Sequence, residues 1–174
     1  MSTENTEETI DSSELVDKVQ IPGDGGELQL FKCDEEYSIS IDGMNTLMST
    51  WAHQSEDALA ELACKKIADR TQARVLIGGL GMGFTLAAAL SHLGADAEVV
   101  VAELNPVVLD WCRGPLANLT AGAASDPRVR VQIGDVAELV RKTAKNAGAE
   151  KVDAIVFDLY KGPYHHNAKL KDPL

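Results

Sequence analysis

The sequence predicts an α/β fold in which a Rossmann-like parallel sheet follows a small antiparallel β-unit. After residue 73, short β-branched runs that are apolar at nearly every position alternate with segments of helical periodicity, the pattern of parallel strands covered on both faces. Between residues 20 and 50, apolar and polar residues alternate instead, which is typical of half-buried antiparallel strands. We therefore expect a β-unit at 19–52 and a Rossmann-like cofactor-binding domain at 53–174.

The N-terminal segment is polar and acidic, and we expect a disordered tail at residues 1–18. Eleven acidic residues and two lysines fall within residues 1–36, so this segment carries −9 of the chain's formal charge of −11. The remaining 138 residues hold only −2 and contain no dense basic run, which argues against binding to nucleic acid or to a membrane surface. A small-molecule ligand is the better expectation.

Cysteine usage and the N-terminus bear on location and on metal binding. Cys33, Cys64 and Cys112 lie far apart, with no CxxC pair and no histidine at ligand spacing, so neither a disulfide framework nor a metal site is expected. Residues 1–15 hold no basic region followed by an apolar run, and no stretch of the sequence is long and apolar enough to span a membrane. We expect a cytoplasmic protein.

The first elements are justified by their periodicity. In EYSISIDG, Tyr37, Ile39 and Ile41 fall on one face of a strand within a small meander. In HQSEDALAELACKKIADR the period becomes helical, with Ser55 as the expected N-cap. The apolar side of this helix is expected at Leu59, Leu62, Cys64 and Ile67.

The rest of the sequence alternates between strands and helices. The strands are expected at 73–79, 97–104, 128–134 and 151–159, and the helices between them at 84–94, 106–114 and 136–148. Asn105 and Asp135 are the expected N-caps of the second and third of these helices. Such βαβ units are right-handed, and ligands bind beyond the carboxyl ends of their strands. The residues just after each strand are therefore the candidates for a site.

The ends of the first two strands point to a nucleotide. The first runs into Gly78-Gly79-Leu80-Gly81-Met82-Gly83, whose glycines leave no side chain between backbone and ligand, although such loops also serve close packing. The second ends at Glu103, next to Leu104, where a carboxylate can accept both hydroxyls of a ribose or simply precede a helix. Together the loop and Glu103 predict an adenosine-containing ligand.

Two aspartates end the other strands. Asp135 either only caps the next helix or also contacts a ligand, with Val136 beside a flat ring. Asp158 emerges from an apolar strand, where its pKa should be raised, and it either takes a proton from an amine or a hydroxyl or holds a loop. The third glycine of a dinucleotide fingerprint would fall on Phe84, which disfavours NAD and FAD.

In this order and spacing, VLIGGLGMG, VVVAELNP, VQIGDV and DAIVFDLYKGP resemble the nucleotide half of class I S-adenosylmethionine-dependent transferases, most closely their spermidine synthase-like branch. The resemblance covers roughly residues 25–165. It implies that the glycine loop faces the amino acid or aminopropyl part of S-adenosylmethionine or its decarboxylated form, and that Glu103 holds the ribose. It further implies that Asp135 and Val136 hold the adenine and that Asp158 deprotonates an attacking amine.

Several departures accompany this resemblance. Gly81 stands where polyamine synthases carry an aspartate for the amine of the donor, and Lys161 stands where they carry a second aspartate for the polyamine. The glutamine and tyrosine of their β-unit and linking helix are not evident. The strands that normally follow the fourth are missing, so we expect a fold incomplete at its C-terminus, as a fragment or with a partner over the sheet edge.

We therefore expect an enzyme that transfers an aminopropyl or methyl group from decarboxylated S-adenosylmethionine or S-adenosylmethionine to a small acceptor such as an amine, with Asp158 as base. The alternatives are a non-catalytic module that binds an adenosyl ligand or assembles with a partner, and an NAD(P)-dependent oxidoreductase. A homodimer is possible, and no metal is expected.

Overall fold

The structure is a computed structural model that describes residues 13–21, 26–43, 45–145 and 151–159. The chain divides into two compact units, residues 1–51 and 52–174, and each is described by itself. Across the described residues, no helix is long and apolar enough to cross a membrane.

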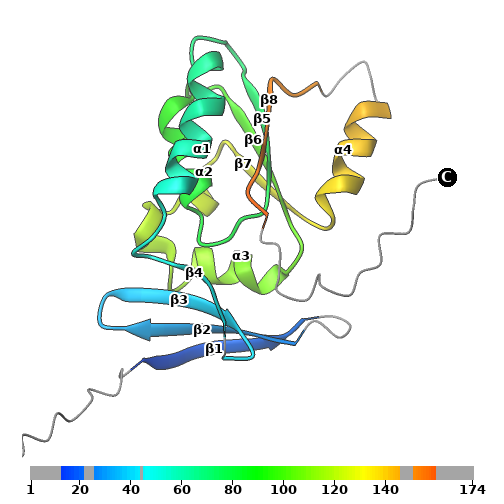
Figure 1. The fold of residues 1–174 in the computed structure, drawn as a ribbon. Helices are drawn as coiled ribbons and strands as arrows, with labels where there is room; N and C mark the ends of the chain where they lie inside the picture. The colour runs from blue at the N-terminus through cyan, green and yellow to red at the C-terminus, as the bar shows by residue number, and fades with distance from the viewer. Residues whose placement is uncertain (1–12, 22–25, 44, 146–150, 160–174) are drawn as a thin grey trace, which may run out of the picture. The chain divides into compact units, whose positions relative to one another are not determined.

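The first unit is an antiparallel meander with the strand order β1-β2-β3-β4 (Figure 1). Its strands span Glu14–Gln20, Glu27–Cys33, Glu36–Ile41 and Asn45–Ser49. Alternation sets the buried face, because Leu28 pairs with Ile41 and Leu30 with Ile39, and all four side chains are buried. The antiparallel β-unit that the alternation predicts is confirmed.

Strand β1 begins earlier than the sequence predicts. A disordered tail is predicted through residue 18, whereas residues 14–18 belong to β1, with Glu14 opposite Lys32 and Lys18 opposite Gln29. Every side chain of residues 14–18 is exposed, so no hydrophobic pattern marks the strand. Pairing with the free edge of β2 forms it instead, because backbone groups at an edge pair without regard to side chains. Residues 1–12 lie outside the described residues.

The second unit is built on a parallel sheet with the strand order β7-β6-β5-β8. These strands are β5 (Arg74–Gly78), β6 (Glu98–Glu103), β7 (Val129–Ile133) and β8 (Ala154–Phe157). The chain runs outward from β5 through β6 to β7 and then returns to the other side of β5 as β8. The point where the strand order reverses therefore lies between β5 and β8, and this is where such sheets bind ligands.

Helices precede or join these strands. They are α1 (Gln54–Cys64), α2 (Phe84–His92), α3 (Pro106–Arg113) and α4 (Val136–Lys145), with short 3₁₀ turns η1 (Lys65–Ile67), η2 (Ala117–Thr120) and η3 (Ala123–Ser125). Figure 1 shows α1 and α2 on one face of the parallel sheet and α4 on the other. Right-handed crossovers require this arrangement, because the chain reverses its direction across the sheet after β7. The predicted parallel α/β architecture is confirmed.

The core of this unit lies on the two central strands. The most deeply buried strand side chains come from β5 and β6, with one from the neighbouring β8, and they are Val75, Leu76, Ile77, Val99, Val101 and Val156. All but Leu76 are β-branched, as expected for strands that pack on both faces. The core thus holds the carboxyl ends of β5, β6 and β8 level with one another, since Gly78 is in register with both Ala102 and Phe157.

Helix α1 differs from its prediction at two positions. The residue before its first turn is His53 rather than Ser55, and among the described residues no side chain caps that turn. Leu62, predicted on the apolar side, is 71% exposed. The buried face is formed by Ala60 and Cys64, and Ile67 continues it in η1. These positions follow the spacing of one helix face, from which residue 62 is turned almost to the opposite side.

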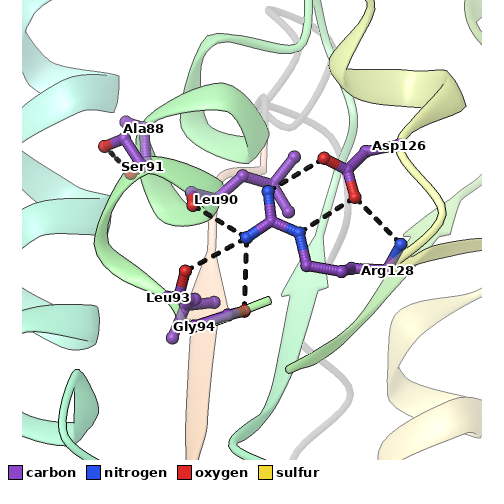
Figure 2. A network of polar contacts seen from close by, with 7 residues as sticks. All are labelled: Ala88, Leu90, Ser91, Leu93, Gly94, Asp126 and Arg128. Atoms are coloured by element: carbon purple, nitrogen blue, oxygen red, sulfur yellow. Dashed lines mark hydrogen bonds and ion pairs between the residues drawn. The ribbon is translucent and has the colours of Figure 1, made fainter. Parts of the chain in front are cut away.

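An arginine from the loop before β7 closes the C-terminal end of α2 (Figure 2). Arg128 Nη1 donates to the carbonyl oxygens of Leu90, Leu93 and Gly94 at 3.1, 3.1 and 3.3 Å. Its Nε and Nη2 donate to the carboxylate of Asp126 at 2.9 and 2.8 Å. The guanidinium therefore satisfies carbonyls that a helix end leaves without partners, and it fixes the helix that carries the glycine loop at its other end.

Candidate functional site

The glycine loop that follows β5 has a backbone that favours glycine. Gly79, Gly81 and Gly83 have φ angles of +91°, +53° and +89°, in the left-handed region. A Cβ atom at Gly79 would also lie 2.1 Å from the carbonyl oxygen of Asp158. The packing explanation of the loop therefore holds at Gly79, independently of any ligand.

Hydrogen bonds tie this loop to the strands on both sides. The Gly79 N–H donates to the carbonyl oxygen of Ala102 at 2.8 Å, and the Asp158 N–H donates to that of Gly78 at 2.9 Å. Gly83 is the N-cap residue of α2. The bare loop backbone thus lies where the ends of β5, β6 and β8 meet the start of a helix.

Glu103 is buried at the end of β6, with both carboxylate oxygens engaged. Its Oε2 accepts a hydrogen bond from the Leu80 N–H at 2.9 Å, and its Oε1 accepts one from the Asn105 N–H at 2.8 Å. The side chain therefore joins the glycine loop to the turn after β6. Each carboxylate oxygen has a further lone pair, so the anchored group retains the capacity to accept the hydroxyls of a sugar.

A buried thiol on α3 forms a hydrogen bond with the backbone of the glycine loop. Cys112 Sγ donates to the carbonyl oxygen of Gly81 at 3.2 Å. Burial raises the pKa of Cys112 to about 12, and the charge of Glu103 adds to the increase. The thiol therefore stays protonated and acts as a packing group.

Asp135 caps α4, as both predicted alternatives require. Its Oδ1 accepts a hydrogen bond from the Ala137 N–H at 2.6 Å, and the side chain is exposed. Val136 is half-buried, and its Cγ2 would lie 2.9 Å from a Cβ atom at Gly78. Val136 thus packs against β5 and explains why position 78 is a glycine.

Two large apolar side chains are exposed at the carboxyl ends of β6 and β7. Leu104 follows Glu103 and is 71% exposed, and Ile133, which pairs in register with Glu103, is 49% exposed. An apolar surface beside an anchored carboxylate is the usual composition of a site for a small ligand.

Asp158 follows β8 at the point where the strand order reverses. Its Oδ2 accepts a hydrogen bond of 2.6 Å from the hydroxyl of Thr85, in the first turn of α2. Burial raises the pKa of Asp158 most, the hydrogen bond from Thr85 opposes the increase, and the charge of Glu56 adds to it. A half-buried carboxylate with a raised pKa can serve as a proton acceptor near neutral pH.

Sequence reasoning missed two groups that act on this carboxylate, Thr85 and Glu56, and one contact at the start of α2. Thr85 is a buried polar residue in an apolar helix, a signal that was available, whereas Glu56 lies in the first turn of α1, where the helix dipole alone explains an acidic residue. The His53 ring stacks on Phe84 with centroids 4.2 Å apart and an interplanar angle of 12°, and its Nδ1 lies 2.9 Å from Asp57 Oδ2. No sequence pattern brings α1 against the start of α2.

The structure places the predicted site residues along one edge of the parallel sheet. The glycine loop and Asp158 lie together at β5 and β8, Glu103 and Leu104 lie at the neighbouring β6, and Asp135 and Val136 lie beyond them at β7. Lys161 lies outside the described residues. Within the described part of the chain, no cluster of three histidine, cysteine, aspartate or glutamate residues could hold a metal ion.

Comparison with known proteins shows a family to which most of the second unit is similar. A family model described as the spermine/spermidine synthase domain matches residues 55–171. The polyamine aminopropyltransferases of Serratia proteamaculans (strain 568) and Pectobacterium atrosepticum are each 35% identical to the chain over 85 residues. That stretch is 49% of this chain and 28% of each relative.

Solved structures show the same fold. A spermidine synthase crystallised with the transition-state analogue AdoDATO matches 83% of this chain with a TM-score of 0.64 and 24% identity. The spermidine synthase of Thermotoga maritima matches 87% of the chain with a TM-score of 0.61 and 23% identity. The chain covers 47% and 48% of these two proteins, so it spans about half of their length.

Proposed function

The chain belongs to the spermine/spermidine synthase family, and from this we propose that it transfers an alkyl group from an S-adenosyl sulfonium donor to a small nucleophile. The donor is S-adenosylmethionine or its decarboxylated form, and the group is correspondingly methyl or aminopropyl. The proposed acceptor is an amine, and the proposed base is Asp158. The related proteins are named polyamine aminopropyltransferases, and this supports a transferase over the oxidoreductase alternative.

The residues of this chain fit such a donor. Gly79, Gly81 and Gly83 keep side chains away from the loop backbone, so the donor's amino acid or aminopropyl part can lie against it. Glu103 is held by two backbone N–H groups and can accept the ribose hydroxyls. Leu104 offers an exposed apolar surface beside it for the adenine, and Asp135 and Val136 complete that end of the proposed site.

The observation that carries the proposal is the position of Asp158. Its half-buried carboxylate follows β8 beside the glycine loop, where a bound sulfonium would lie close to it. The acceptor nitrogen forms a bond to a carbon on sulfur while that carbon–sulfur bond breaks, and the electron pair stays on sulfur. Asp158 takes the proton that the nitrogen loses.

The test is an assay of the full chain with each donor and with putrescine among a panel of small amines. Methylthioadenosine as product indicates aminopropyl transfer, and adenosylhomocysteine indicates methyl transfer. Asp158→Asn should lower turnover by about 10²- to 10⁴-fold while calorimetry still detects donor binding, because asparagine has the same shape but accepts no proton. Asp110→Asn, at an exposed position on α3, is the matched control and should retain turnover.

Three results would contradict the proposal. If calorimetry with the folded protein detects no binding of either donor or of methylthioadenosine, the assignment of the ligand fails. If Asp158→Asn keeps full turnover, the role of base fails. Donor binding without turnover for any acceptor would instead favour the non-catalytic binding module.

A further inference from the structure

We propose that Thr85 is a positioning residue for Asp158: its hydroxyl anchors the Oδ2 atom and leaves Oδ1 directed to the acceptor. This inference rests on the proposed function, in which Asp158 is the base. Thr85 donates to Oδ2 over 2.6 Å across 73 residues of sequence. Among the described residues, Oδ1 has no hydrogen-bond partner, so the two oxygens of the carboxylate are not equivalent.

The location of Thr85 in α2 makes its hydroxyl available. A threonine inside a helix commonly donates to a carbonyl three or four residues earlier. Thr85 is the second residue of α2, so the carbonyls at those distances belong to the glycine loop, and that of Gly81 accepts from Cys112 Sγ. The side chain is only 1% exposed, and its β-branch restricts χ1. A buried, rigid donor therefore faces the carboxylate.

The backbone of Asp158 is already fixed by the glycine loop. Its N–H donates to the Gly78 carbonyl oxygen at 2.9 Å, and its own carbonyl oxygen presses against Gly79. The rotation of the side chain is the freedom that remains. The hydrogen bond from Thr85 removes it, because a carboxylate bonded at one oxygen to a rigid partner holds a single orientation.

The charged surroundings of Asp158 allow an internal check. Of the elements packed around it, α1 contributes the charge of Glu56, whereas the first turn of α2 and the glycine loop contribute no titratable side chain. Glu56 raises the pKa of Asp158, and the hydrogen bond from Thr85 lowers it. Removing the two groups should therefore move the titration of Asp158 in opposite directions.

The experiment titrates the Asp158 carboxyl carbon by NMR in the full chain, with Asp158→Asn to assign its signal. Thr85→Val keeps the side-chain shape but removes the hydroxyl, so the titration midpoint should move to higher pH. Thr85→Ser should restore the midpoint, and Glu56→Gln should move it to lower pH. Thr120→Val is the matched control, because Thr120 is buried but its hydroxyl has no partner among the described residues.

Kinetics then test the catalytic consequence. Thr85→Val should lower kcat by roughly 10- to 100-fold with little change in the KM of the donor, and the acid limb of its pH profile should move with the NMR midpoint. Thr85→Ser should recover most of kcat, and Thr120→Val should resemble the unmodified protein. If Thr85→Val does not fold, Thr85→Ala serves as the second hydroxyl-free variant.

The outcomes separate this inference from the proposed function. An unchanged midpoint in a folded hydroxyl-free variant overturns the anchoring, and an unchanged kcat overturns the positioning role. If the unmodified protein shows no turnover with either donor, the proposed function fails and with it the positioning role, while the NMR midpoints still decide whether Thr85 anchors Asp158.

Discussion

At Gly79 a glycine serves the fold before it serves any ligand. Its φ angle of +91° disfavours a side chain, and a Cβ atom would lie 2.1 Å from the carbonyl oxygen of Asp158. Gly122 has a similar φ angle of +74°, but a Cβ atom there would meet nothing within 4 Å. Substitutions at Gly79 and Gly122 therefore separate the free-energy cost of a left-handed backbone from the cost of a close atomic contact.

We expect Gly79→Ala to lower the free energy of unfolding by more than about 2 kcal/mol, because it adds a backbone clash to the conformational cost of about 1–2 kcal/mol. Gly122→Ala should show only that conformational cost. Urea unfolding followed by circular dichroism measures both. Equal losses in the two variants would show that the contact with Asp158 does not constrain the loop.

Among the elements, α2 connects stability to the site. Its first turn carries Thr85 and follows the glycine loop, and its last carbonyls are bound by Arg128. The role of Arg128 is not visible in the local sequence of α2, and Thr85 is marked there only as a polar residue in an otherwise apolar helix turn. A displacement of its C-terminal end would move Thr85 relative to Asp158, because the helix packs as one body.

We expect Arg128→Met to lower the free energy of unfolding by about 2–3 kcal/mol near neutral pH, because three carbonyls and Asp126 lose a charged donor. Arg113→Met is the matched control and should cost less than about 1 kcal/mol, since within the described part of the chain Arg113 makes one hydrogen bond, to the Ala124 carbonyl. Urea unfolding measures both, and equal losses would contradict the capping role.

The stability that Arg128 contributes should depend on pH. The hydrogen bond from Arg128 lowers the pKa of Asp126 below its ordinary value in the folded protein. A lowered folded-state pKa stabilises the fold above the pKa of the unfolded chain, and this contribution is lost as pH falls through the folded value. The difference in the free energy of unfolding between the unmodified protein and Arg128→Met should therefore become smaller below about pH 4.

At the scale of the whole molecule, strand order determines which strand ends, and therefore which site residues, lie side by side. Because β8 lies beside β5 rather than beyond β7, Asp158 meets the glycine loop instead of the far edge of the sheet. Gly81 lies in that loop with a φ angle of +53°, and two aspartates elsewhere in the chain, Asp34 and Asp42, adopt φ angles of 52°. An aspartate at position 81 is therefore compatible with the backbone.

We expect Gly81→Asp to shift ligand preference toward decarboxylated S-adenosylmethionine, because an added carboxylate repels the carboxylate of S-adenosylmethionine and attracts an amine. Ligand-dependent thermal stabilisation measures this, since a ligand at 100 times its Kd stabilises the fold by about 2.7 kcal/mol. Gly81→Asn, of similar shape without the charge, should leave the preference unchanged. An identical ligand preference in both variants would show that the amino acid part of the donor does not lie against this loop.

The sequence by itself determined the alternation of strands and helices, the right-handed connections, and the placement of Gly79, Glu103 and Asp158 at strand ends. These follow from periodicity, turn chemistry and handedness, which are local properties of a chain. Only the tertiary structure decided that Thr85 bonds to Asp158, that Glu103 bonds to the Leu80 N–H, and that Leu62 is exposed. Such contacts depend on strand order and on helix packing across distant residues, which no local pattern encodes.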